Sequence, residues 1–140
     1  MLRIAIANNS LTSLDIMRRV ILSNPGYAVA WMARDGAETV KKCAQDPPDL
    51  ILMDVALPNL DGVAATCTIM RESPAAILIV TSSVSSNSGK VLQAMGCGAL
   101  DVVQTPVLGP DGQIKGKNEL LSKIERLSRL VHKPLTHAPA

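Results

Sequence analysis

The chain has 140 residues, a net charge of +2 and 47% apolar residues, and only 1% of its residues are aromatic. This length allows one domain with its own core and excludes two. The apolar share excludes general disorder, and the lack of aromatic rings excludes a stacking platform for single-stranded nucleic acid. The small charge does not indicate nucleic-acid binding, and the longest apolar run is too short to span a membrane.

Five short apolar runs alternate with longer amphipathic stretches. Continuous apolar runs of this length are typical of strands that are buried on both faces. Strand–helix alternation repeated five times predicts an α/β fold with a doubly wound parallel sheet and helices on both faces. The predicted strands are Leu2–Ala7, Tyr27–Ala33, Leu50–Met53, Ala75–Val80 and Leu100–Val103.

Five helices are predicted between and after these strands. Thr12 and Asp15 look like a capping pair at the start of the first helix, and Gly96 or Gly98 should end the fourth. The polar, glycine-rich segment 109–117 is expected to be a loop, residues 1–132 to form the domain, and residues 133–140 to be a linker or disordered tail. The apolar faces that mark the helices are Ile16, Met17, Val20 and Ile21, then Ala37, Val40 and Ala44, then Val63, Ala64 and Met70, then Val91, Leu92 and Met95, then Leu120, Leu121, Ile124, Leu127 and Val131.

The three cysteines, Cys43, Cys67 and Cys97, are scattered and include no CxxC pair. An odd count without metal-ligand spacing is typical of reduced thiols in a cytoplasmic protein. We therefore expect no disulfide, no cysteine metal site and a cytoplasmic location.

Polar side chains follow four of the predicted strands. Because the carboxyl ends of parallel strands meet at one edge of a sheet, these side chains should lie close together, where ligands bind in such folds. Asp54 is the only carboxylate among them; it either caps the next helix or serves as the working group of a site. Pro58 and Gly62 predict a turn that leaves Asp54 exposed. The residues at this edge are Asn8, Asn9, Asp54, Thr81, Ser82, Ser83, Gln104, Thr105 and Pro106.

The segment LILMDVALPNLDG, residues 50–62, resembles the acceptor segment of two-component receiver domains, and the resemblance extends over residues 1–131. It implies a flavodoxin-like sheet with strand order 2-1-3-4-5. Within that family the chain is most similar to the receiver half of chemotaxis-type protein-glutamate methylesterases, the CheB and WspF-like branch. The segments that carry this finer resemblance are 34–37, 96–101 and 105–109.

The resemblance implies that a sensor histidine kinase transfers a phosphoryl group to Asp54, with Mg²⁺ offsetting the negative charges. Thr81, with Ser82 and Thr105 beside it, would contact the phosphoryl group and switch the surface of the fourth helix and fifth strand. The output would be a methylesterase effector absent from this chain, so no hydrolase residues are expected here. Receiver domains of this family commonly form dimers through that same surface, so a homodimer is one expected arrangement.

Four residues, at three functional positions, depart from the family pattern. Asn8 and Asn9 stand where the family has acidic metal ligands, Thr105 where it has a lysine, and Val102 at its aromatic switch position. Mg²⁺ prefers carboxylates. A site made of Asn8, Asn9, Asp54 and the Ala56 backbone carbonyl should therefore hold Mg²⁺ weakly or not at all.

Two hypotheses follow from these departures. The domain either accepts phosphate, slowly or with an unusual metal demand, or is a pseudo-receiver that docks or inhibits regardless of phosphorylation. A flavin or nucleotide site at the same edge is disfavoured, because residues 8–12 contain no glycine for a phosphate-binding loop.

Overall fold

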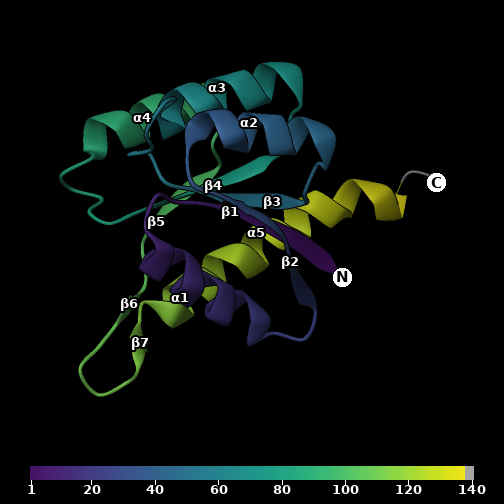
Figure 1. Ribbon diagram of the computed structural model, residues 1–140. Helices are drawn as coiled ribbons and strands as arrows, with labels where there is room; N and C mark the ends of the chain where they lie inside the picture. The colour runs from purple at the N-terminus through teal and green to yellow at the C-terminus, as the bar shows by residue number, and fades with distance from the viewer. Residues whose placement is uncertain (138–140) are drawn as a thin grey trace.

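The computed structural model describes residues 1–137, and the side chains of residues 1–131. Its centre is a parallel sheet with strand order β2-β1-β3-β4-β5 (Figure 1). This confirms the predicted fold and order, although β4 and β5 each begin one residue later than predicted. The strands are β1 (Leu2–Ala7), β2 (Tyr27–Ala33), β3 (Leu50–Met53), β4 (Ala76–Thr81) and β5 (Asp101–Gln104). The helices are α1 (Leu11–Leu22), α2 (Gly36–Gln45), α3 (Gly62–Glu72), α4 (Ser88–Cys97) and α5 (Lys117–His137).

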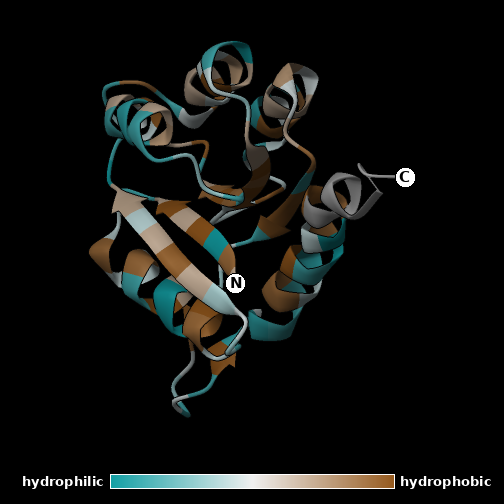
Figure 2. Ribbon diagram, turned by 90° about the vertical axis from the view of Figure 1, so that its right-hand side faces the viewer, coloured by the Kyte–Doolittle hydropathy of each residue, from teal (hydrophilic) through white to brown (hydrophobic). Residues whose placement is uncertain are grey.

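The sheet separates two apolar cores. Helices α2, α3 and α4 cover one face, and α1 and α5 cover the other (Figure 1). Successive side chains of a strand point to opposite faces, so β3 sends Leu50 and Leu52 to one core and Ile51 and Met53 to the other. The strands are accordingly hydrophobic along most of their length, and the helices carry polar outer faces (Figure 2). No helix within residues 1–137 is long and apolar enough to cross a membrane.

The start of α1 differs from the predicted capping pair. Ser10 is the N-cap, and its hydroxyl accepts a hydrogen bond from the backbone N–H of Ser13 at 3.2 Å. The Oδ1 atom of Asn8 accepts from the N–H of Ser10 at 2.8 Å, which turns the chain into the helix earlier. Asp15 forms an ion pair with Arg19 instead of capping.

The segment after β5 is more ordered than the predicted loop. β6 (Val107–Leu108) pairs antiparallel with β7 (Ile114–Lys115) and forms a hairpin that projects beyond α1 in Figure 1. Gly112, in the loop of the hairpin, has φ of 80°, a conformation that glycine adopts without steric cost.

Helix α5 continues to His137, past the expected boundary at residue 132. The backbone of residues 133–137 is thus helical, and the boundary of the domain at residue 132 stays a prediction. Residues 138–140 of the expected tail lie outside the described residues.

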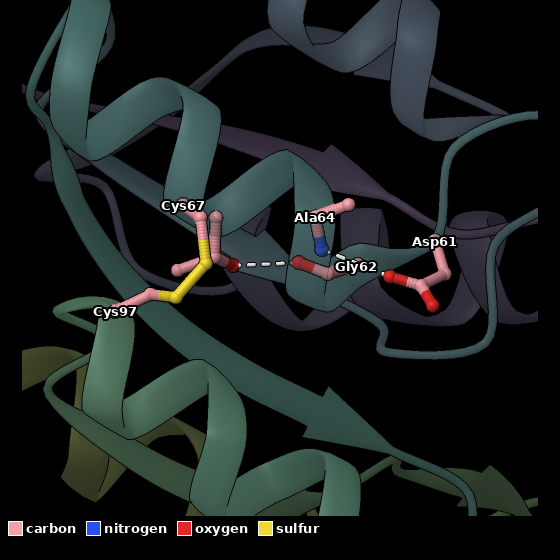
Figure 3. Close-up of a disulfide and its surroundings, with 6 residues drawn as sticks. Asp61, Gly62, Ala64, Cys67 and Cys97 are labelled. Carbon is pink, nitrogen blue, oxygen red and sulfur yellow. Dashed lines mark hydrogen bonds between the residues drawn. A yellow bond between two sulfur atoms is a disulfide. The ribbon is translucent and has the colours of Figure 1, made fainter.

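Two of the three cysteines are joined, so the expectation of three reduced thiols is wrong. Cys67 on α3 forms a disulfide with Cys97, the last residue of α4 (Figure 3). Their Cα atoms are 4.9 Å apart, which suits a disulfide. The pair is 30 residues apart in sequence and meets because α3 and α4 pack side by side. Cys43 is free and buried.

Glycine is required where α3 begins. A Cβ atom on Gly62 would lie 1.9 Å from the backbone oxygen of Asp54. The N–H of Gly62 also donates to the carbonyl of Val55 at 2.9 Å, which holds the first turn of α3 against the end of β3. Gly89 on α4 is different, because a Cβ there would meet nothing within 4 Å.

We predict that Gly62→Ala lowers the free energy of unfolding by roughly 1–3 kcal/mol, because the added methyl group overpacks the backbone at Asp54. Gly89→Ala, in the first turn of α4, is the matched control and should raise it by up to about 1 kcal/mol, since alanine has a higher helix propensity than glycine. Urea denaturation of both variants measures the difference. Equal effects of the two substitutions would contradict the close approach at Gly62.

Candidate functional site

Asp54 lies where β3 ends, and its backbone N–H continues the sheet by donating to the carbonyl of Ala7 at 3.0 Å. The side chain is half-buried. Its Oδ1 atom accepts from the N–H of Ala56 at 3.2 Å, and its Oδ2 atom accepts from Nδ2 of Asn8 at 3.4 Å. Both contacts are long, so the carboxylate is positioned by its surroundings and only weakly satisfied by them.

The turn after Asp54 is held from both sides. Val55 and Leu57 are buried in the core beneath it. Asn59 has φ of 67°, in the left-handed region that asparagine tolerates better than most residues. Its side chain donates to Oδ2 of Asp35, the N-cap of α2, at 2.8 Å. The start of α2 therefore fixes the turn that presents Asp54.

Burial raises the pKa of Asp54, because the charged form loses hydration. The backbone N–H groups of Ala56 and Val55 oppose this rise, and smaller lowering effects come from the Thr81 hydroxyl and the Lys90 charge. Burial outweighs the four together. The carboxylate thus carries negative charge that its neighbours do not fully compensate.

Thr81 and Thr105 lie side by side at the ends of β4 and β5. The backbone N–H of Thr105 donates to the carbonyl of Thr81 at 2.8 Å. Thr81 is fully buried, and its hydroxyl accepts from Nδ2 of Asn87 at 2.9 Å. The Thr105 side chain is 7% exposed, and its hydroxyl has no hydrogen-bond partner among the described residues. A buried hydroxyl without a partner is costly, so it is suited to bind an oxygen of an incoming group.

The two asparagines after β1 differ in their surroundings. Asn8 is buried, with its Nδ2 atom directed at Asp54 and its Oδ1 atom at the N–H of Ser10. Asn9 is exposed, and its backbone carbonyl accepts from the Arg34 guanidinium at 2.9 Å. Among the described side chains of residues 1–131, no three His, Cys, Asp or Glu gather closely enough to hold a metal ion. The donors at this edge are oxygen atoms, which Mg²⁺ prefers, but only Asp54 among them carries negative charge.

The remaining predicted site residues lie around this centre. Ser82 is exposed, one residue beyond Thr81. Ala56 is also exposed and directs its N–H toward Asp54. Val102 is half-buried against the core beneath α2, α3 and α4.

Sequence reasoning missed two residues at this edge. Asn87, just before α4, binds the Thr81 hydroxyl, and Lys90, in the first turn of α4, lowers the pKa of Asp54. The sequence does not identify them directly, because the conformation of the loop before α4 decides which polar residues face Thr81 and Asp54. The clearest available signal was the position of Lys90, the only basic residue between Arg71 and Lys115.

Comparison with known proteins bears directly on this arrangement. Residues 4–112 match the model of the response regulator receiver domain family. A protein-glutamate methylesterase/protein-glutamine glutaminase of Burkholderia thailandensis is 46% identical over 130 residues, covering 93% of this chain and 38% of the relative. A protein of the same name from Mesorhizobium japonicum is 43% identical over 132 residues, covering 93% and 39%. The chain thus spans less than half the length of these relatives.

A solved structure gives the same result at the level of the fold. The response regulator domain of Thermotoga maritima CheB superposes with a TM-score of 0.80 and 29% identity, covering 92% of this chain and 97% of that domain. The resemblance noted from the sequence is therefore confirmed, and the chain belongs to the response regulator receiver domain family.

Proposed function

We propose that this receiver domain accepts a phosphoryl group on Asp54 and thereby regulates a methylesterase domain in a longer protein. The observation that carries the proposal is the half-buried, weakly satisfied carboxylate of Asp54 at the same sheet edge as two buried threonine hydroxyls. The donor is a phosphohistidine of a sensor histidine kinase, and the reaction takes place in the cytoplasm. The name and length of the relatives support the effector.

The chemistry is nucleophilic attack by an Asp54 oxygen on phosphorus, with the imidazole of the donor as the leaving group. The buried hydroxyl of Thr105 donates a hydrogen bond to the phosphoryl oxygen nearest to it, since it has no partner otherwise. The Thr81 hydroxyl binds a second phosphoryl oxygen after its hydrogen bond from Asn87 breaks. Lys90 is exposed in the first turn of α4 and supplies positive charge that Thr105 lacks.

Mg²⁺ is proposed to be held by Asp54, the Asn9 side-chain oxygen and the Ala56 carbonyl. When bound, it offsets the charge between the carboxylate and the phosphoryl oxygens. Asn8 contributes less to the metal, because its amide oxygen is already bonded to the N–H of Ser10. The single carboxylate predicts weak binding.

The central test is intact-mass spectrometry after incubation with Mg²⁺ and phosphoramidate, a small phosphoryl donor. We expect one phosphoryl adduct on the wild-type chain and none on Asp54→Asn. Asp61→Asn is the matched control on the same turn. It should keep the adduct, since asparagine also caps a helix and Asp61 caps α3 through the N–H of Ala64.

An adduct that persists in Asp54→Asn would place the acceptor elsewhere. A complete lack of adduct in the wild-type chain would favour the pseudo-receiver, a docking module that works without phosphorylation.

Asn9→Asp should tighten Mg²⁺ binding about tenfold, or about 1.4 kcal/mol, because it adds a second carboxylate at an exposed position beside Asp54. Titration calorimetry with magnesium chloride measures the affinity. Asn24→Asp makes the same charge change in the turn before β2, where the side chain accepts from the N–H of Gly26, and should leave the affinity unchanged. Equal affinities of the two variants would exclude Asn9 from the metal site.

Asp54→Asn should also stabilise the fold at neutral pH. Since burial raises the folded-state pKa of Asp54, the ionised form is less stable in the folded chain than in the unfolded chain. This cost is absent below the unfolded value, near 3.8, and develops as the pH rises through the folded pKa. In urea denaturation the gain should be present at neutral pH and fade toward pH 4. A variant that is less stable than the wild type at neutral pH would contradict the claim that burying the ionised Asp54 costs stability.

A further inference from the structure

The disulfide joins α3 to the last residue of α4, and neither cysteine is among the residues that would transfer the phosphoryl group. Cys67 and Cys97 are both half-buried, at the surface between the two helices (Figure 3). We propose that this pair is a reversible thiol–disulfide switch that restrains α4 and takes low-molecular-weight disulfides as its oxidant. The coupling of this switch to Asp54 rests on the proposed function.

The accessibility of the cysteines supports selective exchange. Thiol–disulfide exchange needs a thiolate that the reagent can reach. Cys67 and Cys97 are partly exposed, whereas Cys43 is fully buried and its thiol contacts the carbonyl of Ser73 at 3.6 Å. Burial also raises the pKa of the Cys43 thiol, which lowers its reactivity. The chain thus carries one reactive pair and one shielded cysteine.

Helix α4 is lightly anchored apart from this bond. It buries only Val91 and Ala94, while Leu92 is 70% and Met95 39% exposed. Its N-cap residue, Asn87, makes no side-chain capping bond. The helix packs chiefly on α3, and the disulfide ties its last residue there. Reduction therefore removes the one covalent restraint on a helix with few others.

The opposite end of α4 meets the phosphoacceptor edge. Asn87 precedes the helix and donates to the Thr81 hydroxyl at 2.9 Å. If Thr81 turns to a phosphoryl oxygen, it loses that bond and the start of α4 is freed to move. A disulfide that holds the far end of the same helix opposes such movement. By thermodynamic linkage, oxidation then disfavours phosphorylation, and phosphorylation disfavours oxidation.

The exchange proceeds in two balanced steps. The thiolate of one cysteine attacks a small disulfide, RSSR, which forms a mixed disulfide and releases one RSH. The second cysteine then attacks the protein sulfur of that mixed disulfide, which forms the Cys67–Cys97 bond and releases a second RSH. The two protein thiols lose two electrons and two protons, and these are carried by the two RSH molecules. Disulfides of cytosolic proteins are usually transient and redox-sensing, which fits this exchange.

The test begins with intact-mass spectrometry of the purified chain in mixtures of glutathione and glutathione disulfide. We expect a reversible transition in which the oxidised form is lighter by two hydrogen atoms. Cys43→Ser should retain this transition, and both Cys67→Ser and Cys97→Ser should lose it. If glutathione disulfide fails to oxidise the wild-type chain, or the oxidised chain cannot be reduced again, the switch is overturned.

The second measurement compares the fully reduced and fully oxidised wild-type chain under phosphoramidate and Mg²⁺. The reduced form should reach a phosphorylated fraction several-fold higher, and Cys97→Ser should behave as the reduced form under either condition. Equal fractions overturn the coupling even if the cysteines exchange.

Hydrogen exchange at residues 88–97 gives a readout that does not need phosphorylation. It should be slower in the oxidised form. If neither form is phosphorylated, the proposed function has failed on its own, and equal exchange rates of the two forms then overturn the restraint on α4.

Discussion

The partial burial of the Asp54 carboxylate is the constraint on which the site depends. A carboxylate that loses hydration without a strong partner is held at a cost, and the fold meets this cost with the packing of the turn beneath it. Val55 and Leu57 are buried, and Gly62 lets α3 start against the backbone of Asp54. The same uncompensated negative charge allows the carboxylate to bind a cation or to attack an electrophile. The partial burial of Asp54 therefore both lowers the stability of the fold and raises the reactivity of the carboxylate.

The surroundings of Asp54 supply some of the orientation and charge that the family resemblance would lead one to expect from acidic residues at Asn8 and Asn9 and a lysine at Thr105. The N–H of Ala56 and the amide of Asn8 orient the carboxylate, and Lys90 contributes positive charge from α4. Helix α4 is thus connected to the acceptor through Lys90 and through the Asn87–Thr81 bond. Its other end is tied to α3 by the disulfide. Under the proposed function and the proposed switch, phosphorylation of Asp54 and oxidation of the cysteines would therefore act on the same helix from opposite ends.

Much of this arrangement could be predicted from sequence because it follows from strand periodicity. The apolar runs fix the strands, and the rule that ligands bind at the carboxyl edge selects Asp54, Thr81 and Thr105. The Cys67–Cys97 bond could not be predicted, because it depends on how α3 and α4 pack against each other. The Ser10 cap and the partner of Thr81 depend on loop conformations, which have no hydrophobic period to reveal them.

The most direct test of the central claim is a crystal structure of the chain with Mg²⁺ and beryllium trifluoride, which stands in for the phosphoryl group on an aspartate. We expect beryllium bonded to an Asp54 oxygen, with the Thr81 hydroxyl hydrogen-bonded to a fluorine atom and separated from Asn87. An adduct-free Asp54 with the Thr81–Asn87 hydrogen bond intact, at saturating Mg²⁺ and beryllium trifluoride, would contradict this prediction.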